Sequence, residues 1–295
     1  MTEIAAPVAI ASEGLRAWID PMGAQLSALR DADGLDLLWD GDPAIWASRA
    51  PILFPIVGEV AGGAYRVDGK TYHLPRHGLA RRRAFSVVAQ TPHAVTFRLS
   101  ADEASLAVYP FAFELDMIFA LSGTTLAMIA EIRNRGAAPM PASFGFHPAF
   151  CWPLPYLAER SAHQILFDKA EPAPVRRISP EGLVKAQTYP SPVEGRVLPL
   201  SDDLFVDDAL ILDQLASPGL TYGPPEGRQL KIDFPGAPYL GLWTKPNAPF
   251  VCVEPWWGIA DPEGFTGELA DKPGMMIVPP GGVRSVAMTV TLTGG

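Results

Sequence analysis

The stretch FAFELDMIFALSGTTLAMIAEIR, residues 111–133, indicates the fold most clearly. Its first half places apolar side chains at every second position: Phe111, Phe113, Leu115, Met117 and Phe119. Its second half repeats the pattern: Leu126, Met128, Ala130 and Ile132. A period of two is typical of a strand with one buried face, and the polar turn SGTT separates the two runs. The stretch therefore predicts a long antiparallel hairpin.

The same alternation recurs along the chain, in AVTFRLS (94–100) and in SVAMTVTL (285–292). No stretch longer than about ten residues holds a helical period of 3.6, and 31 prolines and 27 glycines interrupt the chain. We therefore expect an all-β protein, a large antiparallel β-sandwich with few short helices, folded as one domain over residues 1–295. The proline-rich segment 154–200 is expected to be a surface excursion that covers one side of a cleft.

Composition narrows the choice of partners. The net charge of −9 argues against nucleic acid or an anionic membrane as the main partner. No apolar run approaches the ~18 residues of a membrane-spanning helix. The two cysteines, Cys151 and Cys252, are too few for a disulfide framework, and the first residues lack the basic start of a secretory signal. These features predict a reduced, cytoplasmic protein.

One dense basic cluster stands out on this acidic chain. It is the stretch RHGLARRR, residues 76–83, with Arg76, Arg81, Arg82 and Arg83. The cluster fits either a small anion site or a solvated strand end, and the solvated end is the more economical interpretation.

The stretch VCVEPWWG, residues 251–258, places Glu254 between an apolar run and two tryptophans. An isolated buried carboxylate is costly, so this group is expected to be paired, raised in pKa, or catalytic. His147 lies in SFGFHPAF among three phenylalanines. It is either a core histidine bonded to a backbone carbonyl or the partner of Glu254. In the second case the field of each group is expected to favour the charged form of the other.

A carboxylate and a histidine that face each other across a cleft can act as general base and general acid. The flat faces of Trp256 or Trp257 suit the C–H faces of a sugar, and one of the two is expected to pack in the core. A zinc site at His73 and His77 is not expected, because Pro75 separates them and no H-E-x-x-H helix is present. His93 and His163 are expected to face solvent.

Five motifs in order resemble the aldose 1-epimerase (galactose mutarotase) family, and most closely its bacterial LacX-like branch. They are RAPILFPIVGEV (49–60), YHLPRHGLARRRAF (72–85), FGFHPAF (144–150), LFVDDALI (204–211) and FVCVEPWWGIAD (250–261). The resemblance implies a sandwich of galactose mutarotase type with a sugar-binding cleft and no metal or organic cofactor. The partner it implies is a small sugar, and a monomer or weak homodimer fits.

The resemblance also implies a role for each of several positions. Glu254 matches the base that takes the proton of the anomeric O1 hydroxyl, and His147 matches the acid that protonates the ring oxygen. His77 and Arg49 match substrate-binding residues. Asp208 matches the substrate-binding aspartate, with Asp207 an equal candidate.

Three alternatives remain open. A hexose-6-phosphate epimerase of the same superfamily would use Arg49, Arg76, Arg81 and Lys245 to hold the phosphate. A non-catalytic sugar-binding module of the same fold would have no need of both Glu254 and His147. A two-carboxylate glycosidase is least favoured, because only one carboxylate is expected to be buried.

Overall fold

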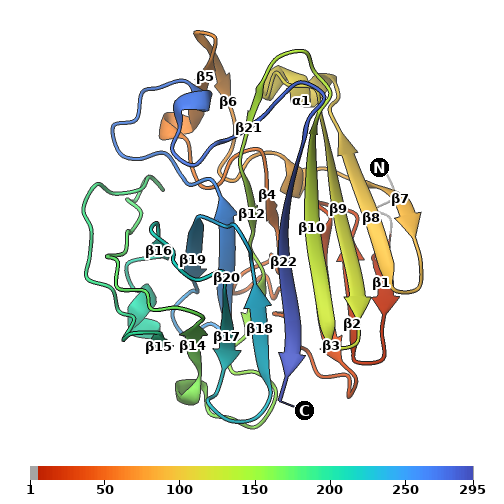
Figure 1. Cartoon of the computed structure of the whole chain (residues 1–295), viewed down its shortest axis with the longest axis vertical. Helices are drawn as coiled ribbons and strands as arrows, with labels where there is room; N and C mark the ends of the chain where they lie inside the picture. Colours follow the sequence, from red (N-terminus) through yellow and green to blue (C-terminus); the bar gives the residue numbers. More distant parts are fainter. Residues whose placement is uncertain (1–5, 295) are drawn as a thin grey trace.

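The computed structural model describes residues 6–294. Its largest element is a nine-stranded sheet in the order β15–β14–β17–β18–β22–β10–β9–β8–β7 (Figure 1). The strands span Val197–Pro199 (β15), Gln164–Phe167 (β14), Gly219–Gly223 (β17), Gln229–Asp233 (β18), Val283–Thr293 (β22), Thr125–Asn134 (β10), Phe113–Ser122 (β9), Ala94–Ser100 (β8) and Ser86–Gln90 (β7). Each neighbouring pair is antiparallel.

The hairpin predicted for residues 111–133 is confirmed as β9 and β10. Met128 lies opposite Phe119, and Ala130 lies opposite Met117. On the other side of β10, Met288 of β22 pairs with Met128. The inward-facing residues of β9 and β10 are 5 % exposed or less, since a fixed register of period two puts all of them on one buried face.

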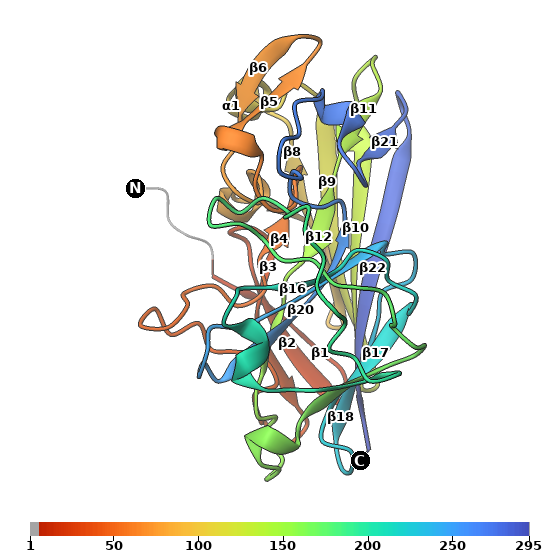
Figure 2. The same ribbon diagram turned by 90° about the vertical axis from the view of Figure 1, so that its left-hand side faces the viewer.

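A second layer faces this sheet (Figure 2). It contains a six-stranded sheet in the order β16–β19–β20–β12–β4, with β13 also paired to β20. These strands span Leu210–Leu212 (β16), Tyr239–Trp243 (β19), Phe250–Trp257 (β20), Phe144–Phe146 (β12), Ile52–Leu53 (β4) and Ala149–Cys151 (β13). A three-stranded sheet extends the layer: Val8–Ala11 (β1), Leu15–Asp20 (β2) and Gln25–Asp31 (β3).

The remaining elements are short. Two small two-stranded sheets are also present. One is the hairpin of β5 (Ala64–Val67) and β6 (Lys70–His73), and the other is a long-range antiparallel pair of β11 (Met140–Ala142) and β21 (Met276–Val278). The one α-helix in the described range is α1, Glu103–Val108. Short 3₁₀ turns span Ala61–Gly63 (η1), Ala80–Arg82 (η2), Arg160–Ala162 (η3), Asp202–Phe205 (η4) and Leu269–Asp271 (η5). No helix within residues 6–294 is long and apolar enough to cross a membrane.

The main apolar core lies between the two layers and draws residues from Ile10 through Val290. This continuous cluster includes residues from strands of both layers. The all-β sandwich expected from the alternating sequence is the observed architecture. A smaller cluster, with Ile211 and Trp256, lies on the outer side of the six-stranded sheet. The excursion expected over residues 154–200 reaches this cluster through Ile178 and Val184.

Candidate active site

Strand β20 presents Glu254 to a cavity by simple alternation. Val251 and Val253 face the main core, whereas Glu254 and Trp256 point to the opposite side of the sheet. Glu254 pairs with Gly241 of β19 in register and is only 2 % exposed. A strand that is buried on both faces therefore carries one carboxylate into its apolar surroundings.

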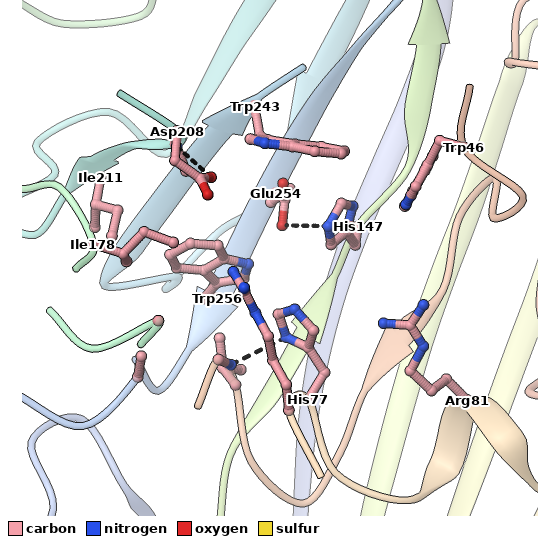
Figure 3. A pocket seen from close by; sticks show the side chains of 16 residues that line it. Trp46, His77, Arg81, His147, Ile178, Asp208, Ile211, Trp243, Glu254 and Trp256 are labelled. Carbon is pink, nitrogen blue, oxygen red and sulfur yellow. Dashed lines mark hydrogen bonds and ion pairs between the residues drawn. The ribbon is translucent and has the colours of Figure 1, made fainter. Parts of the chain in front are cut away.

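The cavity has a volume of about 250 Å³ and lies over the outer face of the six-stranded sheet (Figure 3). It is lined by Trp46, Val57, Gly58, Arg76, His77, Arg81, His147, Ile178, Gly182, Asp208, Ala209, Ile211, Trp243, Glu254, Trp256 and Ala260. These residues come from eight separate stretches of sequence, so the site exists only in the folded chain. The excursion over residues 154–200 supplies part of the wall, as its composition led us to expect.

His147 faces Glu254 directly. It lies between β12 and β13, where Pro148 ends one strand segment, and its Nε2 is 3.2 Å from Oε2 of Glu254 (Figure 3). The imidazole stacks on Trp46 with ring centroids 5.3 Å apart. Its Nδ1 is buried and has no hydrogen-bond partner among residues 6–294. His147 is therefore the neighbour of Glu254 and not a core histidine held by a backbone carbonyl.

Burial controls the protonation of this pair. It raises the pKa of Glu254 to about 8 and lowers the pKa of His147 to about 3. Arg81 and Arg76 further oppose a charge on His147, and their pull on the pKa of Glu254 is smaller than the effect of burial. Both shifts favour the neutral form of each group, which is opposite in direction to the charged pair expected from the sequence.

His77 is held in one orientation beneath the pair. Its backbone has φ of +68°, and its Nδ1 accepts a hydrogen bond of 3.1 Å from the backbone N–H of Gly58. That bond leaves the proton of the neutral ring on Nε2, which can donate to a ligand. Burial, with His147 nearby, lowers the pKa of His77 well below its ordinary value. The ring centroids of His77 and His147 are 6.0 Å apart.

Of the two candidate aspartates, Asp208 lines the cavity and Asp207 does not. Asp208 has a positive φ of +65°, and its Oδ1 accepts a hydrogen bond of 2.7 Å from the N–H of Ala209. This tight local bond turns the carboxylate toward the cavity (Figure 3). The backbone conformation distinguishes the neighbours, which the sequence alone could not.

The arginines of the basic cluster at residues 76–83 differ in whether they reach the cavity. Arg76 and Arg81 line the cavity, and Arg81 donates a 3.1 Å hydrogen bond to Oγ of Ser48. Among residues 6–294, neither of the two forms a salt bridge. Arg83 instead pairs with Asp102 away from the cavity. The solvated-end interpretation therefore fails for Arg81.

Two expected phosphate or sugar ligands lie elsewhere. Arg49 is not in the cavity wall, because its Nε donates to the backbone carbonyl of Asp40. Lys245 is also outside the wall and donates to the carbonyl of Ile45. Both long side chains are bound to the backbone of the loop before Arg49. Arg76, in contrast, lines the cavity.

The two tryptophans of β20 have different environments. Trp257 packs in the main core against Phe146, whereas Trp256 forms part of the cavity wall. The indole of Trp256 lies flat over its neighbours because Gly241 and Gly145 have no side chains. A Cβ at Gly241 would come within 2.3 Å of the Trp256 ring, and one at Gly145 within 2.8 Å. The aromatic wall thus depends on glycines of both flanking strands.

Several residues of the wall could not be predicted from the sequence. Trp46 and Trp243 both pack against His147, with Trp243 at 6.0 Å between ring centroids. Neither lies in a motif with a chemical signature, so no sequence signal marks them. The expectation for His163 is wrong: it is 1 % exposed, and its Nε2 accepts from the N–H of Leu154. His93 is exposed, as expected.

The fold and the cavity together define an all-β sandwich protein with a buried carboxylate–histidine pair in an aromatic cleft. The chain belongs to the aldose 1-epimerase family, whose family model matches residues 8–287. It is 32 % identical over 276 residues to the chromosomal protein LacX of Lactococcus lactis subsp. lactis, covering 90 % of this chain and 92 % of that one.

Solved structures agree with this assignment. A galactose mutarotase related enzyme from Lactobacillus acidophilus has a TM-score of 0.89 at 29 % identity, covering 97 % of both chains. A galactose mutarotase-like protein from Lactobacillus casei has a TM-score of 0.90 at 29 % identity, covering 98 % of this chain and 100 % of the other. The galactose mutarotase type of sandwich is therefore the fold of this protein.

Proposed function

We propose that the protein is an aldose 1-epimerase that interconverts the α and β anomers of a hexose by ring opening and closure. The observation that carries the proposal is the 3.2 Å contact between Glu254 and His147 in the wall of a cavity of about 250 Å³. Family membership supports an isomerase acting on a small sugar. A cytoplasmic monomer or weak homodimer is the setting we propose for it.

In the mechanism, Glu254 takes the proton of the O1 hydroxyl while His147 protonates the ring oxygen O5. The C1–O5 bond breaks, and the electron pair of the former O1–H bond forms the aldehyde. Rotation about C1–C2 and the reverse transfers then close the ring on the other face. The two protons exchanged with the sugar are returned, so no other reactant is consumed.

The reaction needs Glu254 ionised and His147 protonated, so the pair must carry one proton between them. Transfer of that proton from Glu254 to His147 across their contact changes the neutral pair into the ionised one. Hydroxyls of a bound sugar would add hydrogen bonds that favour the carboxylate. Mutarotation also proceeds without a catalyst, so a positioned base and acid worth about 100- to 10,000-fold each are sufficient.

Other residues of the wall would hold the sugar. The Nε2–H of His77 and the carboxylate of Asp208 are placed to bond ring hydroxyls from two sides of the cavity (Figure 3). The indole face of Trp256 would cover C–H groups. Acceleration of anomer exchange by the protein, measured by NMR, is the test of this function.

A second candidate is a hexose-6-phosphate 1-epimerase, and one observation favours it. Arg76 and Arg81 reach the cavity without a carboxylate partner among the described residues. Arg81 lies on the His147 side of the pair (Figure 3), the side from which C6 would extend if His147 serves O5. Guanidinium groups are well suited to phosphate.

Replacement of Arg81 by alanine distinguishes the two substrates. If Arg81 binds a phosphate, Arg81→Ala should reduce kcat/KM for glucose 6-phosphate by about 10- to 100-fold, the value of a charged hydrogen bond. Exchange of glucose should change by less than about threefold. Anomer exchange of both sugars measures the difference. Arg82→Ala is the matched control, since Arg82 is exposed and outside the wall. Equal losses on both sugars would return Arg81 to a structural role.

A further inference from the structure

A third side chain with metal-binding chemistry lies beside the Glu254–His147 pair. Cys252 is two residues before Glu254 on β20, so both side chains leave the same face of the sheet. One donor atom each from His147, Cys252 and Glu254 lie within 4.8 Å of one another. Cys252 is fully buried and forms no disulfide. The cavity wall includes the other two residues but not Cys252.

We propose that His147, Cys252 and Glu254 form a binding site for a thiophilic divalent metal ion such as Zn²⁺, and that occupation of this site inhibits the protein. The ion is not a cofactor in this proposal. The ion would coordinate the carboxylate and the imidazole that the proposed epimerase reaction needs. Binding of the metal and binding of a sugar would therefore be mutually exclusive.

The donor set suits zinc. Zinc binds imidazole nitrogen, thiolate sulfur and carboxylate oxygen, with three protein ligands and a water at sites that stay open. Small side-chain rotations toward a common centre would bring the three donors to bonds of about 2.0–2.3 Å. Nε2 of His147 and Oε2 of Glu254 are already 3.2 Å apart. The buried Nδ1 of His147 has no partner among residues 6–294, so no hydrogen bond at that atom opposes a small rotation of the ring.

Charge balance also favours a divalent ion. On binding, Cys252 loses its thiol proton and Glu254 gives up its carboxyl proton, and both protons leave for solvent. The resulting thiolate and carboxylate together compensate the 2+ charge, so the buried site stays neutral overall. Monovalent hard cations gain nothing from the thiol. Arg76 and Arg81 oppose the approach of any cation, so the coordination bonds must overcome their repulsion.

The chain offers an internal control because it contains only two cysteines. Cys151 lies on β13, which pairs with β20, yet it is not part of the cluster. A metal effect that requires Cys252 but not Cys151 can therefore be attributed to this site and not to general thiol binding.

The test is a titration of the metal-free protein with Co²⁺. Binding is monitored by the charge-transfer absorption between thiolate and cobalt. We expect one Co²⁺ per chain, with the thiolate absorption, in the wild type and in Cys151→Ser. In Cys252→Ala, the affinity for Co²⁺ should fall by at least ~10-fold, because loss of a ligand should cost no less than loss of a residue that only hydrogen-bonds a ligand. The thiolate absorption should disappear. Cys252→Ser, closer in size, should behave in the same way and guards against a folding defect in the alanine variant.

Absence of stoichiometric Co²⁺ binding to the wild type would overturn the proposal. Thiolate absorption that persists in both Cys252 variants, or that is lost in Cys151→Ser, would also overturn it. The absorption is read without substrate, so this result is independent of the proposed epimerase activity. Where exchange activity is found, Zn²⁺ should inhibit the wild type at concentrations at least ~10-fold below those needed for Cys252→Ala.

Discussion

Replacement of Glu254 by glutamine is expected to lower the rate of enzymatic anomer exchange by about 100- to 10,000-fold. Glutamine has the shape of the neutral acid but cannot accept the proton of O1. Burial already favours the neutral form of Glu254, so Glu254→Gln should unfold at a temperature close to that of the wild type. Exchange rates by NMR and thermal unfolding measure both parts.

Glu171→Gln is a matched control for this variant. Glu171 is also 2 % exposed, but it does not line the cavity. Its carboxylate accepts hydrogen bonds from the backbone N–H groups of Ala216 and Ser217. That variant should keep full exchange activity and lose stability. A fully active Glu254→Gln protein would mean that another group is the base.

Replacement of His147 by glutamine should reduce exchange to a similar extent, about 100- to 10,000-fold, because no acid remains to protonate O5. Glutamine can place an amide near the position of Nε2, so the contact with Glu254 is kept without a titratable group. Some stability will be lost with the stacking on Trp46. The comparison is therefore made on kcat at a temperature where the variant is folded.

His73→Gln serves as the control for this histidine variant, since His73 is exposed on β6 and outside the cavity wall. It should exchange sugars at the wild-type rate. If His147→Gln keeps more than about a tenth of the wild-type kcat, a general acid role for His147 is excluded.

The sandwich could be predicted from the sequence because burial repeats along each strand. Leu115, Met117 and Phe119 alternate with more exposed residues, and so do their partners in β10. A period of two with one buried face leaves little choice of structure. The same alternation predicts that Glu254 and Trp256 lie on one face of β20. The sequence did not show which part of the protein that face contacts.

The meeting of His147 with Glu254 could not be derived from spacing, since 106 residues lie between them in the sequence. The long-range pairings of β12 and β13 with β20 bring them together. The resemblance to a family supplied that expectation. Long side chains were predicted least well: Arg49 bonds the backbone of its own loop, and Arg76 reaches the cavity. A residue name in a motif does not determine where a flexible side chain ends.

The protonation of the pair was also beyond the sequence. It depends on how completely His147 and Glu254 are removed from water and on the two arginines that share their cavity. His163 shows the same limit, because polar neighbours in its sequence suggested exposure while backbone bonds to both ring nitrogens hold it inside.

Anomer exchange in NMR spectra of galactose, glucose and glucose 6-phosphate, each with and without the protein, is the direct test of epimerase activity. We expect the exchange of at least one of these sugars to become faster in proportion to the concentration of the wild-type protein, and we expect no such acceleration from Glu254→Gln. Acceleration of the phosphate alone would select the second candidate function. Saturable sugar binding without acceleration of any of the three would exclude an epimerase and indicate a binding module.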